Sequence, residues 1–361
     1  MRFENFDPDP PPWFWEGEGL GTVNLSNQAL TNVAFIGIKK RGKFLPRATA
    51  FLVNYRQEQH TFCHLVTAEH VIAGLLTRNQ EIWLRVNVLG GKTTELLIPD
   101  AGNVFRFHPN NENEPTDVAV CPFTLTHHDE ETGETIKIDM TALALDGNPK
   151  NGFLPSEEFA KNSIVLGAEI AIVGLFRSHY GTNRNIPIVR VGNIAALPGE
   201  PVFTKYAGYI KAYLVEARSI AGLSGSPVVV LPDPTAMLAE GLMRPHLEQQ
   251  SLALLGLMHG HFDVPNLNED VVSDEDEPER GVHTGIGVVI PVEKIVETLE
   301  HPDLIAMRKK VIDRLREAKG ATADLVADDA SAEPAGDANP NHLKDFTRLV
   351  DVAARKRPQD D

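Results

Sequence analysis

The feature that most constrains the fold is a succession of short apolar segments between residues 32 and 290. Segments such as "ATAFLV", "EIAIVG" and "SPVVV" are rich in Val, Ile, Leu and Phe and are separated by turn residues. No regular helical pattern of core length lies between them, which favours an antiparallel all-β chain over repeated strand–helix–strand units. About a dozen strands exceed the needs of one small barrel. We therefore predict two packed antiparallel β-barrels, over about 31–150 and 160–290.

The flanking regions have a different texture. Residues 1–30 are proline-rich and predict an extended N-terminal arm. The sequence after residue 291 has apolar residues at helical spacing, which predicts C-terminal helices: one that closes the main domain, 31–300, and a second over 301–319. Residues 320–340 have the low hydrophobicity of a linker. The last segment, 341–361, predicts a short helix and tail, with an apolar face over 343–354 that offers a docking surface for a partner.

Composition limits the partners of the chain. Acidic residues outnumber basic ones by 50 to 34, and the net charge of −16 repels phosphate backbones, so we expect no nucleic acid partner. Two cysteines do not make a disulfide framework. The N-terminus lacks the basic start and apolar run of a secretory signal, and no segment approaches the roughly 18 apolar residues of a membrane span. We expect no membrane association and a cytoplasmic location.

The segment "AGLSGSPVV", residues 221–229, suggests a nucleophile on a bend. A Gly-x-Ser-x-Gly elbow requires glycine at 226 and a helix after it, whereas Ser226 is followed by a strand pattern. What remains is a glycine-flanked bend at Ser224, with the backbone N–H groups of Gly222 and Ser224 converging as an oxyanion hole. An ordinary Gly-Ser turn leading into a strand is the alternative.

Two further segments supply the groups that a serine nucleophile needs. In "VTAEHV" a strand ends just before His70, which suits a rigidly held general base. In "PTDVAV" Asp117 directly precedes an apolar strand, where it can orient an imidazole. Taken singly, His70 is better explained as an ordinary half-buried histidine and Asp117 as a turn residue.

Together, "VTAEHV", "DVAV" and "GLSGSPVV" resemble the surroundings of the catalytic histidine, aspartate and serine in trypsin-like peptidases of the chymotrypsin fold, in the same chain order. The similarity covers about residues 30–300, and "GIGVVIPVEKIVETL" is similar to the closing strand and helix of the bacterial high-temperature-requirement type. Many of those relatives carry an appended peptide-binding domain, for which the tail here is too short.

The resemblance implies a serine endopeptidase that acts on proteins or peptides without a cofactor. Ser224 would be the nucleophile, His70 the general base and Asp117 the group that orients it, with Gly222 and Ser224 forming the oxyanion hole. Leu223 departs from the pattern, because digestive members carry an aspartate there that pairs with a newly cut N-terminus. We therefore expect no activation by N-terminal cleavage.

The resemblance also locates a specificity pocket. Its floor would include Arg218 and Ser219, and the strand "GLMHGHF" with His259 and His261 would form one wall. A cationic floor would favour an acidic substrate side chain. The alternative is that Arg218 turns to solvent and the histidines lie on a loop.

An acidic segment, 266–280, follows this wall. A solvated loop, a lid, a loose cation site and an attractor for basic substrates are all compatible with it. We expect no metal site, since Cys63 and His64 would point to opposite faces of a strand and no second ligand pair has zinc spacing.

Two other functions remain open from the sequence. The same fold can serve as a catalytically weak or inactive protein-binding module, although loss of a triad residue would be its usual sign. An esterase is the other, because acyl-transfer chemistry does not require an amide.

Overall fold

The computed structural model describes residues 27–128, 133–145, 155, 160–161, 163–217, 222–231, 253–264 and 282–328. Most of the predicted N-terminal arm, Arg218 and Ser219, the acidic segment 266–280 and the predicted helix over 343–354 lie outside these residues. Within them, no helix combines the length and the apolar character needed to cross a membrane.

The N-terminal half forms an eight-stranded sheet in the order β5-β4-β1-β2-β3-β7-β6, with β10 paired to β2 beside this path. The two ends of the path do not pair with each other among the described strands. The β10–β2 pair is parallel, and the other pairs are antiparallel. The strands are β1 (Val33–Lys40), β2 (Lys43–Gln57), β3 (His60–Thr67), β4 (Ile82–Val88), β5 (Lys92–Ile98), β6 (Arg106–Phe107), β7 (Ala119–Pro122) and β10 (Leu143–Ala144). This half also contains α1 (Asn27–Thr31), α2 (Glu69–Thr77), α3 (Ala101–Val104) and a small hairpin of β8 (Thr126–His128) and β9 (Thr135–Lys137).

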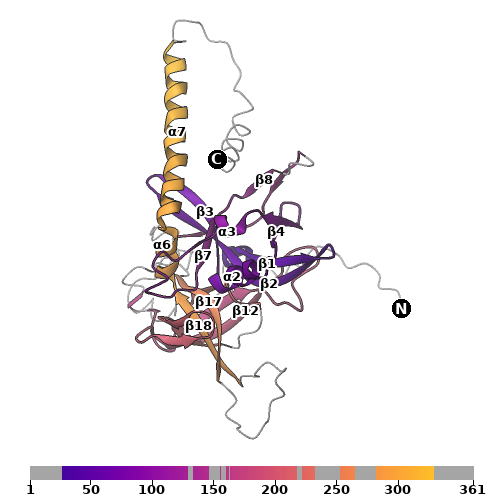
Figure 1. Ribbon diagram of the computed structural model, residues 1–361, viewed down its shortest axis with the longest axis vertical. Helices are drawn as coiled ribbons and strands as arrows, with labels where there is room; N and C mark the ends of the chain where they lie inside the picture. Colours follow the sequence, from indigo (N-terminus) through magenta and orange to yellow (C-terminus); the bar gives the residue numbers. More distant parts are fainter. Residues whose placement is uncertain are drawn as a thin grey trace, which may run out of the picture.

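The C-terminal half is a closed antiparallel barrel in the order β11-β12-β15-β18-β17-β16. Its strands are β11 (Glu169–Gly174), β12 (Ile188–Ala196), β15 (Tyr213–Glu216), β16 (Pro227–Val230), β17 (Ala253–Val264) and β18 (Val282–Pro291). A hairpin of β13 (Val202–Thr204) and β14 (Gly208–Ile210) lies between β12 and β15 in the chain. Two helices follow the barrel, α6 (Val292–Leu299) and α7 (Pro302–Asp328). The predicted mainly β fold with two packed β units and C-terminal helices is confirmed (Figure 1).

Alternation along the central strands explains why their sequences are continuously apolar. In β16, Val228 and Val230 point into the closed barrel, whereas Val229 belongs to the cluster shared by both halves. In β2, Leu52 packs inside the N-terminal sheet and Phe51 faces the shared cluster. Successive side chains of a strand point to opposite faces, so a strand buried on both faces needs apolar residues at every position. The seam between the two halves is therefore a hydrophobic core in its own right.

Helix α7 is attached to the N-terminal sheet by a buried arginine. Arg308 is 0% exposed and donates hydrogen bonds to the Gln57 side chain and the Leu299 carbonyl, at 2.6 and 2.8 Å. It also lies 3.2 Å from His64 Nε2 and stacks over the Tyr55 ring. The helix continues to residue 328, so it extends past the predicted end at 319 into the segment predicted as linker (Figure 1).

Candidate active site

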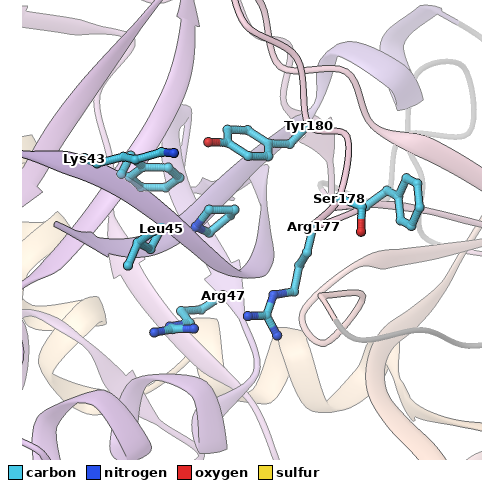
Figure 2. Close-up of a pocket in the computed structure, with 9 residues that line it drawn as sticks. Lys43, Leu45, Arg47, Arg177, Ser178 and Tyr180 are labelled. Carbon is cyan, nitrogen blue, oxygen red and sulfur yellow. The ribbon is translucent and has the colours of Figure 1, made fainter. Parts of the chain in front are cut away.

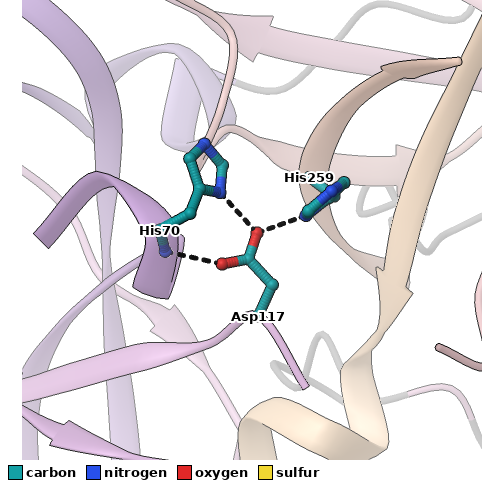
Figure 3. Close-up of side chains that lie close together, drawn as sticks. All are labelled: His70, Asp117 and His259. Atoms are coloured by element: carbon teal, nitrogen blue, oxygen red, sulfur yellow. Dashed lines mark hydrogen bonds and ion pairs between the residues drawn. The ribbon is translucent and has the colours of Figure 1, made fainter. Parts of the chain in front are cut away.

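The structure brings His70 and Asp117 into direct contact at the seam between the two halves. Strand β3 ends at Thr67, and His70 lies in the first turn of α2. Its ring Nδ1 lies 2.7 Å from Asp117 Oδ2, and its backbone N–H donates to Asp117 Oδ1 at 2.8 Å (Figure 3). Two bonds to both carboxylate oxygens fix the imidazole in one orientation, with Nε2 directed away from the carboxylate.

Asp117 is positioned by helix α6 as well as by strand β7. The segment that leads to it is tied to α6 by a bond between His108 Nε2 and Glu297, at 2.7 Å, and by a 2.8 Å ion pair of Lys294 with Glu114. Both contacts join residues far apart in the chain. The closing helix therefore helps to hold the carboxylate in place.

A second histidine contacts the same carboxylate oxygen. His259, on β17, is buried, and its Nδ1 makes a short hydrogen bond to Asp117 Oδ2 (Figure 3). The His259 and His70 rings meet edge to face, with centroids 5.2 Å apart. The sequence predicts His259 near the substrate pocket but not this bond to Asp117. A local signal for it is lacking, because the contact spans 142 positions.

The two histidines decide the charge state of Asp117. Burial opposes its negative charge, but the attraction of His70 and the hydrogen bonds from His259 and His70 outweigh burial and hold the pKa of this carboxyl well below its usual range. Asp117 is therefore a carboxylate at neutral pH. Next to His70 in the chain, burial raises the pKa of Glu69 to about 7, the charge of Asp117 adds to this shift, and a hydrogen bond from Asn111 opposes it.

The predicted nucleophile lies on a tight turn that packs against the start of α2. Gly222 and Gly225 have φ of 109° and 81°, values at which side chains are strained. A Cβ on Gly225 would lie 2.4 Å from Thr67 Oγ1 and 3.2 Å from the Ala68 nitrogen. Ser224, the half-buried residue between these glycines, is thereby held close to the end of β3, just before His70.

Thr49 on β2 holds this turn against both halves of the molecule. Its hydroxyl donates to the Gly222 carbonyl at 2.8 Å and accepts from the Leu175 N–H at 2.9 Å. Its backbone N–H donates to the Ser224 carbonyl at 3.0 Å, and its carbonyl accepts from the Thr67 hydroxyl at 2.8 Å. Thr49 is completely buried. This role of Thr49 is not predictable from the sequence, because a threonine within an apolar strand has no distinctive pattern.

The backbone N–H groups predicted as an oxyanion hole, those of Gly222 and Ser224, donate to no other described residue. The Ser224 hydroxyl likewise bonds neither to His70 nor to another side chain in the described part of the chain. Catalytic hydrogen bonds are often long in unliganded enzymes and shorten when substrate binds.

An aromatic side chain covers His70 from the β13–β14 hairpin. Tyr206, at the tip of that hairpin, stacks on the imidazole with centroids 4.6 Å apart and an interplanar angle of 10°. Tyr206 is nevertheless 66% exposed, and its hairpin neighbours Phe203 and Tyr209 are exposed as well. The hairpin therefore forms an aromatic wall beside the general-base candidate.

The predicted specificity residues are only partly visible. His261 lies exposed on β17, two positions after the buried His259. Arg218 and Ser219 fall outside the described residues. A substrate-pocket role for these residues remains a prediction.

The same trio is the one group of potential metal ligands found in the described part of the chain. Donor atoms of His70, Asp117 and His259 all lie within 4.8 Å of one another. Both Nδ1 atoms already bond to a single carboxylate oxygen, so a metal ion would have to replace these hydrogen bonds. In this structure the two histidines act as N–H donors to the buried Asp117 carboxylate.

Comparison with known proteins gives structural similarity only. No family model and no curated protein matches the sequence. Among solved structures, the chain is similar to the MamO protease domain from Magnetospirillum magneticum, with 15% identity, a TM-score of 0.42, and coverage of 75% of this chain and 97% of that one. It is also similar to the HtrA-type protease AlgW with a tripeptide, with 17% identity, a TM-score of 0.40 and coverage of 76% and 60%. A third similar structure is Deg5, with 14% identity, a TM-score of 0.37, and coverage of 75% of this chain and 88% of that one. At such low identities, the functional assignment depends on the geometry of the site.

Proposed function

We propose that the protein is a serine endopeptidase in which Ser224, His70 and Asp117 form the catalytic triad. The observation that carries the proposal is the pair of hydrogen bonds between His70 and the buried Asp117 carboxylate, next to the turn that bears Ser224. An imidazole fixed in this way has Nδ1–H as a donor and Nε2 as an acceptor, which is the tautomer that a general base requires.

In the proposed reaction, the Ser224 hydroxyl gives its proton to His70 Nε2 while its oxygen bonds to the carbonyl carbon of the substrate. The carbonyl oxygen becomes an oxyanion, for which the N–H groups of Gly222 and Ser224 are available as donors. His70 then protonates the leaving amine, and the C–N bond breaks. Water, activated by His70, releases the acyl group in the second half of the reaction.

Asp117 stabilises the imidazolium that exists between the two proton transfers. Its charge is retained at neutral pH because both histidines hold its pKa down. A carboxylate shared by two Nδ1–H donors also keeps both rings from rotating. We expect Asp117→Asn to lower turnover by roughly 10⁴-fold, because an amide can stabilise the wrong tautomer of His70.

The test is labelling by a fluorophosphonate, which reacts with an activated serine. The full-length protein should be labelled at Ser224, as located by peptide mass, and should cleave casein. Ser224→Ala should abolish both, with turnover lower by roughly 10⁶-fold and an unchanged unfolding curve. Ser226→Ala is the matched control in the same turn. Casein cleavage by Ser224→Ala equal to that of the parent protein would overturn the mechanism.

A protein-binding module with little hydrolysis is the second candidate. Two observations favour this candidate. Tyr206 covers one face of the His70 ring, and the Ser224 hydroxyl makes no hydrogen bond to His70 in this structure. If labelling of the parent protein is absent, Tyr206→Ala separates the two candidates. A triad that is only covered should then be labelled, whereas a binding module should stay unlabelled.

A further inference from the structure

A cationic pocket lies beside the turn that carries Ser224. Its volume is about 560 Å³, and it is formed by the start of β2 and by the loop after β11 (Figure 2). Its lining includes three positively charged residues and no acidic one: Lys43, Arg47 and Arg177. The other lining residues are Phe44, Leu45, Pro46, Phe176, Ser178 and Tyr180.

These three charges gather in one pocket without a counter-charge from the described residues. Lys43, Arg47 and Arg177 are exposed, and none of them forms an ion pair or side-chain hydrogen bond with another described residue. The whole chain has a net charge of −16, so acidic partners for them are plentiful in the sequence. A gathering of like charges without counter-charges is unfavourable, and an anion bound among them relieves the repulsion.

The pocket wall is held rigidly. Arg85, a buried residue of β4, donates to the backbone carbonyls of Tyr180 at 3.3 Å, Gly181 at 3.0 Å and Thr182 at 2.8 Å. Its guanidinium also bonds to the Asn185 side chain at 2.6 Å. The loop after β11 is thereby attached to the N-terminal sheet, and the pocket spans both halves of the molecule. A site that is preformed loses less free energy on binding a ligand.

The pocket adjoins the predicted oxyanion hole. A Cβ on Gly222 would lie only 2.9 Å from Arg177 Cγ, so the arginine side chain packs directly on that glycine. Arg47 precedes Thr49 by two positions, and the Thr49 hydroxyl bonds to the Gly222 carbonyl. Met258 of β17 bonds to the opposite side of the turn, through Gly225 and Ser226. The cationic pocket and β17 therefore lie on two sides of the turn that carries Ser224.

We propose that this pocket binds a carboxylate of the substrate on the leaving-group side of the cleaved bond. This inference rests on the peptidase function proposed above. Strand β17 carries the predicted specificity residues His259 and His261 and bonds to this turn through Met258, so we assign its side to the acyl half of the substrate. The cationic side is then left for the half that departs. Two guanidinium groups suit a carboxylate because each offers paired N–H donors in one plane. The carboxylate comes from an aspartate or glutamate side chain, or from the C-terminus of a short peptide.

The experiment compares quenched-fluorescence peptides that share an acyl half and differ after the cleaved bond. Glutamate or glutamine is placed at the first, second or third position of the leaving half, and each peptide is made with a free and an amidated C-terminus. We expect kcat/KM to be about 10-fold higher for the best glutamate peptide than for its glutamine partner. A higher kcat/KM for the free than for the amidated C-terminus, without a difference between glutamate and glutamine, would assign the site to a terminal carboxylate. Either preference should weaken as the salt concentration rises.

The variant that tests the residues is the double substitution Arg47→Ala and Arg177→Ala, in which the ratio should fall to about one. Arg314→Ala, an exposed position on α7 outside the pocket, is the matched control and should keep the parental ratio. A preference for the carboxylate-bearing peptide, by side chain or by free C-terminus, that persists unchanged in the double variant would overturn the proposal. Equal kcat/KM values of the parent protein for all of these peptides would overturn it as well.

Failure of the peptidase function can be told apart from failure of the pocket. If no peptide is cleaved, fluorescence anisotropy of the same labelled peptides measures their affinity for the intact protein. Tighter binding of a carboxylate-bearing peptide, lost in the double variant, would support the pocket without hydrolysis. Equal affinities of the glutamate and glutamine peptides, both amidated and free, would refute it.

Discussion

Replacing Thr49 by valine tests whether one buried hydroxyl holds the nucleophile turn in place. Valine has nearly the shape of threonine, so packing is preserved while two hydrogen bonds are lost: the one to the Gly222 carbonyl at 2.8 Å and the one from the Leu175 N–H at 2.9 Å. Both backbone groups are then left in a buried place beside a methyl group. A stranded buried polar group costs about 1–3 kcal/mol. With two such groups, the free energy of unfolding should fall by about 2–6 kcal/mol, a large part of the roughly 5–15 kcal/mol of a typical domain.

The assay is urea unfolding followed by tryptophan fluorescence, with Thr49→Ser as the control. Serine keeps the hydroxyl and loses one methyl group, which should cost only about 1 kcal/mol. A second measurement is the rate of fluorophosphonate labelling at Ser224. Thr49→Val should slow it much more than Thr49→Ser, because the Gly222 carbonyl is no longer fixed. Equal unfolding midpoints for the valine and serine variants would show that the hydrogen bonds of the Thr49 hydroxyl do not stabilise the fold.

Two further predictions concern the charges around His70. His259→Ala removes one hydrogen-bond donor from Asp117 and so raises the pKa of that carboxyl. A depressed carboxyl pKa contributes stability that is lost as pH falls. Acid unfolding of His259→Ala should therefore begin at a higher pH than that of His259→Asn, which keeps an N–H donor. Equal acid midpoints would exclude this role. For Glu69, a pKa raised from 4.5 to about 7 means that the folded protein holds a proton that the unfolded chain has lost, so its contribution to stability should decline between about pH 4.5 and pH 7. Urea midpoints of Glu69→Gln across that range should lack the decline, and parallel curves for variant and parent would contradict the prediction.

The type of fold is predictable from the amino-acid sequence, because a strand buried on both faces needs apolar residues at every position. The segments 50–53 of β2, 170–173 of β11 and 228–230 of β16 are apolar without interruption, and the structure divides their side chains between the interior of each half and the shared seam. The short motifs around His70, Asp117 and Ser224 also predict that these three residues lie close together in the fold. The structure joins His70 to Asp117 and packs the Ser224 turn against the strand end before His70. The triad as a whole remains a proposal.

Boundaries of elements were less predictable than their type. Helix α7 runs to residue 328, although the residues after 319 have the composition of a linker. Alanine, which is frequent there, favours helix even where hydrophobicity is low, and a helix already anchored by Arg308 needs little more to continue.

The residues that surround these side chains come from distant parts of the chain and were not predictable from the sequence. His259 meets Asp117 across 142 positions, Thr49 meets Gly222 across 173, and Tyr206 reaches His70 from a separate hairpin. Arg47 and Arg177 form one pocket although they belong to different halves of the molecule. Periodicity reports which face of a strand is buried, but not which distant strand will cover it. The motifs that carry the proposed nucleophile and base are local in the sequence, whereas the residues that surround them depend on how the two β units pack.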